Sequence, residues 1–184
     1  MPPITFITSN PNKLLEVTAI LPNTISLTHR ALDLPEIQGS LEEIAIAKCR
    51  RAAEIIQGPV LVEDSALEFR ALNGLPGPYV KYFLEALGND GLNRLLDGFD
   101  DRTAEAVCTF AYSPGPGRQP LVFQGRITGV IVPPRGPPVF GWEPIFEYQG
   151  TTLAEMEHEI KNGLSHRYKA LSKFQEWLSI TKLR

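Results

Sequence analysis

The feature that most constrains this chain is a short apolar run that ends in two adjacent carboxylates. A Gly-Pro pair precedes Val60–Val62, and Glu63 and Asp64 follow directly. A β-branched run bounded in this way is typical of a buried strand, and open α/β sheets bind ligands beyond the carboxyl ends of their strands. The pattern therefore predicts an α/β fold in which a strand ends at Val62, with two acids at the edge where ligands bind.

Two interpretations of this acid pair stay open. One is a solvated turn in which Asp64 caps the next element; the other is a divalent cation held against a phosphate. Mg²⁺ prefers hard oxygen ligands, commonly one or two carboxylates together with substrate phosphates. The following segment favours the cation, because a Gly- and Pro-rich loop from Leu72 leads into a helix-compatible segment that carries Lys81. A lone lysine is also often simply solvated.

Composition narrows the function classes. The chain has 184 residues, of which 43% are hydrophobic, so we predict one well-packed domain over residues 1–184. The formal net charge of -3 argues against a general binder of nucleic acid or of anionic membranes. Two cysteines, Cys49 and Cys108, favour reduced intracellular thiols over a disulfide framework. We expect neither a secretory signal nor a membrane span, since no basic leader or long apolar run is visible.

A second candidate anion site lies near the N-terminus. Ile4–Thr8 predicts the first strand, and Asn10 is suited to cap a helix that runs from Pro11 to about Leu21. Unpaired N–H groups and the helix dipole at such a start both favour phosphate, and Lys13 would add a charge. A plain capped helix is the alternative, because the turn lacks the glycines of a P-loop.

The next predicted helix carries a lysine on its apolar face. Ser40–Glu43 forms a capping box that opens a helix to about Ile56. Lys48 interrupts a stripe at spacings of three and four, formed by Leu41, Ile44, Ala52 and Ile55. Burying an unpaired lysine is costly, so Lys48 either extends to solvent or reaches a buried anion. Other predicted strands are Ile25–His29, Thr103–Tyr112 and Leu121–Val132, and helical segments are Leu84–Leu87, Gly91–Leu96 and Tyr168–Leu178.

Two further segments carry candidate binding residues. Phe140–Pro144 packs two aromatics and an acid around a glycine, which suits either closure of a core or stacking on a planar ligand. Ser165 is a suitable N-cap, which would place His166 and Arg167 in the first turn of a helix. Cations there oppose the helix dipole, so the pair is either tolerated or used to bind a base or a phosphate.

Five segments occurring in order give the chain a resemblance to a known family. They are Thr8–Lys13, Val62–Ser65, Asn73–Lys81, Phe140–Pro144 and Lys161–Arg167. Together they resemble the inosine triphosphate pyrophosphatase family, the Ham1-like pyrophosphatases of non-standard purine nucleoside triphosphates, and most of all its eukaryotic branch. The resemblance implies an α/β fold with an elongated, curved mixed β-sheet flanked by helices, two lobes with a nucleotide-binding cleft between them, and a homodimer.

The resemblance also implies an activity. The expected enzyme hydrolyses ITP, dITP and XTP to the monophosphate and pyrophosphate, which cleanses the nucleotide pool. It requires Mg²⁺, with Mn²⁺ as a substitute, and works in the cytoplasm and also in the nucleus. Its partners are a small-molecule nucleotide and a second copy of the chain, without nucleic acid or membrane.

The resemblance assigns roles residue by residue. Asp64 and Lys13 are catalytic, and the metal-associated acids are Glu36, Glu63 and Asp64. The triphosphate loop comprises Thr8, Ser9, Asn10, Pro11, Asn12 and Lys13. Further substrate-binding residues are Lys48, Asp64, Ser65, Lys81 and Lys161. Around the base lie Phe140, Gly141, Trp142 and Glu143, and the 6-oxo edge is read by His166 and Arg167.

Elementary chemistry supports these roles. Lysines and Mg²⁺ would stabilise charge on the leaving pyrophosphate, and Asp64 would orient or deprotonate water. Two features depart from the family pattern: Glu143 stands where aspartate is common, and no proline follows the methionine of Glu155–Lys161. The alternatives are a catalytically impaired nucleotide-binding protein of the same fold and a phosphomonoesterase that uses Asp64 as nucleophile.

Overall fold

A computed structural model describes residues 2–182, which divide into two compact units. Unit 1 comprises Met1–Asp64, Cys108–Gly125 and Arg167–Arg184, and unit 2 comprises Ser65–Val107 and Arg126–His166. Each unit is therefore assembled from segments that are distant in the sequence. Two units agree with the two lobes that the resemblance implies, and the single domain expected from chain length stays a prediction.

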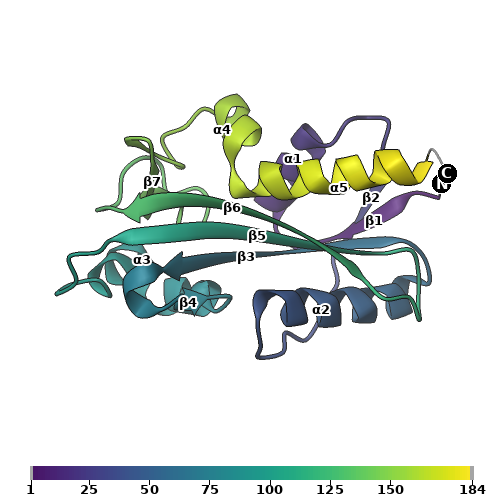
Figure 1. Ribbon diagram of the computed structural model, residues 1–184, viewed down its shortest axis with the longest axis horizontal. Helices are drawn as coiled ribbons and strands as arrows, with labels where there is room; N and C mark the ends of the chain where they lie inside the picture. The colour runs from purple at the N-terminus through teal and green to yellow at the C-terminus, as the bar shows by residue number, and fades with distance from the viewer. Residues whose placement is uncertain (1, 183–184) are drawn as a thin grey trace. The chain divides into compact units, whose positions relative to one another are not determined.

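The strands form a mixed sheet (Figure 1). The strands are β1 (Ile4–Ile7), β2 (Leu27–Arg30), β3 (Val60–Phe69), β4 (Pro76–Gly77), β5 (Thr103–Ser113), β6 (Leu121–Ile131), β7 (Phe146–Tyr148) and β8 (Thr151–Thr152). Their order is β2-β1-β3-β5-β6-β7-β8, and β4 pairs with β3. β1 runs parallel to both β2 and β3, whereas β4, β7 and β8 pair antiparallel with their neighbours. This confirms the expected mixed α/β fold.

Five α-helices and two short 3₁₀ turns occupy the described part of the chain. The helices are α1 (Pro11–Ile20), α2 (Leu41–Ile56), α3 (Val80–Arg94), α4 (His158–Leu164) and α5 (His166–Lys182), and the 3₁₀ turns are η1 (Arg70–Leu72) and η2 (Glu143–Ile145). α3 consists of two helical segments that meet at Gly88, whose φ of 66° interrupts the helix, as the sequence predicts. Within residues 2–182, no helix combines the length and apolarity needed to cross a membrane.

Unit 1 covers both faces of β1 and of the first part of β3. α1 and α5 lie on one face, and α2 lies on the opposite face (Figure 1). Phe6 and Leu61 pack with the side chains of α1 and α5, whereas Ile7, Val60 and Val62 pack with those of α2. This division follows from the alternation of side chains along a strand. The continuous apolar run Val60–Val62 of β3 is thereby explained, since a strand covered on both faces needs no polar alternation.

The buried stripe of α2 differs from the predicted one. Leu41, Ile44 and Ala52 are buried as expected, but Ile55 is 38% exposed. The stripe instead continues through small residues, namely Ala45, Cys49 and Ala53. These side chains recur at spacings of four and are short enough to let the helix approach the sheet closely, which leaves Ile55 beside the contact rather than in it.

The strand predicted to end at Val62 also continues. β3 runs through both acids to Phe69, because its second half pairs with β4, Leu67 opposite Gly77 and Glu68 opposite Pro76. The partner that does end is β1, whose last pair with β3 joins Ile7 to Val62. Glu63 and Asp64 therefore lie at the end of the parallel pairing, although they lie in the middle of their own strand.

Unit 2 has a separate apolar core. Its strands and α3 contribute Phe69, Leu92, Ile127 and Phe146, among others. The polar stretch Glu155–Lys161, for which no element was predicted, contains the start of α4. The sequence did not predict this helix, because it has only seven residues and no apolar stripe. Its Ile160 is 58% exposed and does not form part of a buried face.

Candidate functional site

The loop between β1 and α1 is ordered by its own polar groups. Asn10 caps α1 as predicted: its Oδ1 accepts from the backbone N–H of Asn12 at 3.0 Å and of Lys13 at 3.2 Å. The N–H of Asn10 in turn donates to Thr8 Oγ1 at 3.1 Å. The expectation of unpaired amides for phosphate is therefore wrong for these two positions, since the cap already satisfies them. The helix dipole at this end of α1 still favours an anion.

A buried charge network lies next to this loop. Lys13 Nζ is 2.8 Å from Glu63 Oε2, and Arg167 Nη2 donates to Glu63 Oε1 at 3.1 Å. Arg167 Nη1 also pairs with Glu16, and the Arg167 side chain is 1% exposed. Burial alone would lower the pKa of Arg167, but Glu63 and Glu16 raise it above its ordinary value. Two cations thus face two carboxylates, which offsets the cost of burying each charge.

Lys48 reaches carboxylates rather than solvent. Its Nζ lies 2.6 Å from Asp64 Oδ1 and 2.9 Å from Glu36 Oε1. Burial by itself lowers the pKa of Lys48, and the two acids more than reverse this, so the lysine stays charged. Burial raises the pKa of Asp64 above its ordinary value, and Lys48 and Lys13 offset that rise only in part. Of the two alternatives left open for Lys48, the structure favours contact with an anion over extension to solvent, but the anions are carboxylates of the protein and not a ligand.

The three predicted metal-associated acids are held by cations of unit 1. Glu63 contacts Lys13 and Arg167, while Asp64 and Glu36 share Lys48. Across residues 2–182, no group of three or more His, Cys, Asp or Glu side chains is arranged to hold a metal ion. Asp64 Oδ2, however, is buried and has no hydrogen-bond partner among the described residues. A hard, buried oxygen in that state suits Mg²⁺, so the donor chemistry fits the expected ion.

A second cluster lies in unit 2 and contains the aromatic loop. Glu143 accepts from Lys161 Nζ at 2.7 Å and 2.9 Å, one bond to each carboxylate oxygen. Lys161 is 3% exposed and Glu143 is 7% exposed, and the ammonium also lies 5.5 Å from the ring centroid of Phe140. Glu143 and the segment carrying Lys161 are the two departures from the family pattern, and the structure joins them in one ion pair.

The aromatic loop serves two purposes. Trp142 is buried, with its ring centroid 5.7 Å from that of Phe146 and 5.5 Å from that of His166, so it closes the core. Phe140 is only partly buried and remains suitable for stacking on a planar ligand. Gly141 adopts a φ of 55°, which favours glycine, and its carbonyl accepts from Asn89 Nδ2 of α3 at 3.1 Å.

The remaining predicted site residues lie in β3, α3 and α5. Ser65 follows Asp64 in β3 and is partly buried. Lys81 is exposed in the first turn of α3, with its ammonium 5.8 Å from the ring centroid of Tyr82. His166 begins α5 directly after Ser165, as predicted. His166 and Arg167 were predicted as one pair that reads the base, but His166 contacts Trp142 whereas Arg167 binds Glu16 and Glu63.

Sequence reasoning missed Glu16 and Cys108. Glu16 is 5% exposed, and Cys108 is fully buried and donates from Sγ to Glu63 Oε1 at 3.3 Å. Burial raises the pKa of the Cys108 thiol well above its ordinary value, so it acts as a neutral donor. The available signal was the position of Glu16 beside Val17 on the inward side of α1, where an acid requires a buried partner.

Comparisons with known proteins identify the family of this chain. The sequence matches the Ham1 family over residues 4–177. It is 64% identical over 178 residues to an inosine triphosphate pyrophosphatase of Emericella nidulans, covering 97% of both chains. It is 66% identical over 177 residues to one of Aspergillus oryzae, covering 95% of this chain and 93% of that one.

Solved structures point the same way. A HAM1 protein from Coxiella burnetii superposes with a TM-score of 0.86 at 30% identity, covering 97% of this chain and 99% of that one. A nucleoside-triphosphatase, or dITP/XTP pyrophosphatase, from Mycobacterium abscessus gives a TM-score of 0.73 at 29% identity, covering 93% of this chain and 97% of that one. By sequence and by fold, the chain belongs to the Ham1 family.

Proposed function

We propose that this protein hydrolyses ITP, dITP and XTP to the corresponding monophosphate and pyrophosphate. The names of its relatives support this activity, since they are called inosine triphosphate pyrophosphatases and a dITP/XTP pyrophosphatase. The observation that carries it is the cluster at the start of α1, where Lys13 and Lys48 contact three carboxylates. Such a set matches a polyanion that arrives with a divalent cation.

The lysines and the acids of this cluster have different roles in the proposed reaction. The triphosphate competes with carboxylates for the ammonium groups of Lys13 and Lys48, which then stabilise charge on the departing pyrophosphate. Glu36, Glu63 and Asp64 would hold Mg²⁺, or Mn²⁺ in its place. When bound, the ion neutralises phosphate charge and activates water. When the triphosphate takes Lys48, Oδ1 of Asp64 is released, so one carboxylate oxygen would hold the ion and the other would accept the proton of the attacking water, which burial favours by raising the pKa of the carboxyl.

The cluster of unit 2 is assigned to the purine. Phe140 stacks on the ring, and His166 donates to its 6-oxo oxygen. Adenine presents an amino group at that position, so a buried donor would lose its partner, at a cost of about 1–3 kcal/mol. The Glu143–Lys161 pair fixes the loop that carries Phe140. Arg167 supports Glu63 in this assignment and does not read the base.

Product analysis tests the proposal. With Mg²⁺ present, ITP and XTP should yield pyrophosphate and the monophosphate, while ATP and pyrimidine triphosphates should react far more slowly. Orthophosphate as the main product would instead indicate a phosphomonoesterase. Binding of ITP without turnover would indicate the catalytically impaired alternative. Comparable rates on ATP and ITP would contradict the specificity assigned to His166.

The proposal extends to the oligomeric state of the protein and its location in the cell. We infer a homodimer in the cytoplasm, with the nucleus as a second location, on the strength of the family resemblance. Nucleic acid is not assigned as a partner, since the net charge is -3. Sedimentation at equilibrium would give the mass of the assembly, and a mass equal to that of one chain would contradict the dimer.

A further inference from the structure

His29 makes a contact that neither the sequence nor the proposed chemistry uses. It lies in β2, opposite Phe6 of β1, and its Nε2 is 2.7 Å from the backbone oxygen of Thr8. A carbonyl oxygen only accepts hydrogen bonds, so Nε2 must carry the proton and donate. Thr8 is the first residue of the triphosphate loop, so the contact ties that loop to the edge strand.

β2 holds both backbone polar groups of Thr8. The N–H of Thr8 donates to the carbonyl of Arg30 at 3.2 Å, and its oxygen accepts from His29. From Thr8 the contacts continue along the loop, because Thr8 Oγ1 accepts from Asn10 N–H and Asn10 caps Lys13. A chain of hydrogen bonds thus runs from the ring of His29 to the N–H of the residue that carries the phosphate-binding ammonium.

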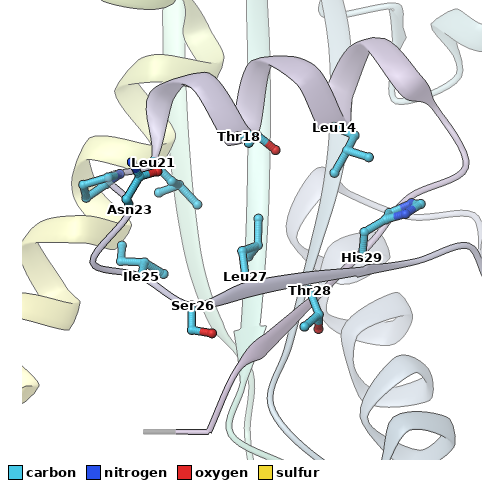
Figure 2. A pocket seen from close by; sticks show the side chains of 10 residues that line it. Leu14, Thr18, Leu21, Asn23, Ile25, Ser26, Leu27, Thr28 and His29 are labelled. Carbon is cyan, nitrogen blue, oxygen red and sulfur yellow. The ribbon is translucent and has the colours of Figure 1, made fainter.

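A pocket beside the His29–Thr8 hydrogen bond increases the contribution of that bond to the placement of the loop. A space of about 430 Å³ lies between α1 and β2, and Leu14, Thr18, Leu27 and His29 are among the residues that line it (Figure 2). Figure 2 shows His29 at one end, near Leu14, and Asn23 at the other end. The space is open to solvent, and Leu14 of α1 and Leu27 of β2, which line it, are only partly buried, so packing at this edge holds β2 against α1 less closely than a fully buried core would. A hydrogen bond at the loop end therefore contributes more to the placement of the loop.

We propose that His29 is a positioning residue for phosphate binding: by donating from Nε2 to the carbonyl of Thr8, it holds the loop Thr8–Lys13 in the shape that receives the triphosphate. It touches no phosphate itself. The ligand assignment rests on the proposed function, whereas the ordering of the loop does not. Loss of the donor should weaken binding of the phosphates more than it slows the chemical step, because Asp64 and Lys48 are positioned independently of β2 and only Lys13 is carried by the loop.

Three variants test the role. His29→Ala removes the donor, and His29→Gln keeps an N–H donor on a side chain of similar reach. Asn23→Ala alters the opposite end of the same cavity and is the matched control. We expect His29→Ala to raise KM for ITP roughly three- to tenfold, a change typical of one hydrogen bond, and to lower kcat by a smaller factor, because Lys13 also stabilises charge on the departing pyrophosphate. His29→Gln should recover at least half of the loss, and Asn23→Ala should match the wild type.

Two readouts separate this proposal from the proposed activity. Binding of inorganic tripolyphosphate, measured by calorimetry, should weaken in His29→Ala roughly three- to tenfold, whether or not the wild type hydrolyses ITP. Without any ligand, hydrogen exchange at the amides of Asn12 and Lys13 should be faster in His29→Ala than in Asn23→Ala. Unchanged binding and exchange in His29→Ala would overturn the proposal. Equal losses in His29→Gln and His29→Ala would also overturn it, since the donated proton would then not matter.

Discussion

The Asp64 carboxylate has one oxygen that can accept a proton, and the ammonium groups of Lys48 and Lys13 lie near it. Lys48 occupies Oδ1, and Oδ2 is buried without a hydrogen-bond partner among residues 2–182. Asp64→Asn should lower kcat for ITP by about 10²- to 10⁴-fold, the usual contribution of a positioned general base. Binding of ITP should survive, because Lys13 and Lys48 are retained.

The control for this prediction lies on the same strand. Glu68 also belongs to β3, and its carboxylate pairs with Arg126 rather than with Lys13 or Lys48. Glu68→Gln should therefore leave kcat near the wild-type value. Single-turnover kinetics with calorimetric binding would distinguish the two variants, and near-normal rates in Asp64→Asn would make Asp64 a structural residue.

Glu143 and Lys161 form the second residue-level test. In Glu143→Gln the Lys161 ammonium stays buried without its full counter-charge, which typically costs about 3–5 kcal/mol of unfolding free energy. Turnover of ITP and GTP should fall together, because the loop that carries Phe140 loosens. In Glu143→Asp the charge is kept on a shorter side chain, so the loss should be smaller and the ratio of ITP to GTP turnover should change.

A double variant isolates the pair. Glu143→Gln combined with Lys161→Met removes both charges and should recover part of the stability lost in Glu143→Gln. Urea denaturation of the single and double variants measures the coupling. Strictly additive effects, with kcat/KM unchanged for both nucleotides, would show that the ion pair has no role in the loop.

The sequence predicted individual site residues more reliably than it predicted which residues they contact. The position of Lys48 on the apolar stripe of its own helix restricted it to two alternatives, extension to solvent or contact with an anion, and the structure shows the second. Arg167, in contrast, was assigned to the base, yet it binds Glu16, which is 151 positions away, and Glu63, 104 positions away. Partners at such separations are set by tertiary packing, and no local pattern encodes them.

Elements were predicted well wherever their causes are local. The Ser40–Glu43 capping box and the Asn10 cap each involve residues within three positions, and both are present in the structure. The end of β3 was predicted wrongly, because its second half depends on pairing with β4. Short helices such as α4 offer too few residues for a periodic signal. Local chemistry thus fixes where helices begin, whereas long-range pairing fixes where strands end.

Gly129 provides a test of strand pairing in unit 2. A Cβ at this position would lie 2.3 Å from the carbonyl oxygen of Glu147 and 2.6 Å from Cζ of Phe146. Gly129→Ala should therefore force β6 away from β7 and cost about 1–3 kcal/mol of unfolding free energy, as overpacking commonly does. A melting temperature equal to that of the wild type would show that β7 shifts to accommodate the added methyl group without loss of stability.

Gly163 is the matched control for this substitution. It lies in α4, and a Cβ there would meet no atom within 4 Å. Gly163→Ala should be neutral or stabilise the protein by roughly 0.5–1 kcal/mol, because alanine favours a helix. Calorimetric melting of both variants compares a glycine that the fold requires with one that it does not.

For the whole molecule, the two thiols report on unfolding of unit 1. Cys49 and Cys108 are both buried, and burial raises the pKa of Cys49 from 9.0 to about 12. Since only the thiolate reacts, native protein should not react with a thiol reagent at neutral pH, and both thiols should react in concentrated guanidinium. Labelling followed by mass spectrometry checks this, and rapid modification of the native chain would contradict it.

The same thiols predict how stability varies with pH. Their pKa is higher in the folded chain than in the unfolded chain, so the folded state is favoured fully below about 9. As pH rises above that value, the unfolded thiols ionise first, and the free energy of unfolding should decrease. Cys49→Ala should show a weaker decrease than the wild type when urea denaturation is repeated across the alkaline range.

The interleaving of the two units has a consequence for synthesis on the ribosome. Unit 1 begins at the N-terminus, yet its core needs Leu171 and Phe174 of α5, which pack with Phe6, Leu61 and Phe110. All residues of unit 2 leave the ribosome before those two. A nascent chain that stalls before residue 167 therefore carries aromatic side chains of β1 and β5 that α5 has not yet covered. Such a chain presents the exposed apolar surface that chaperones and proteases recognise, so translational pausing late in the message should favour its degradation.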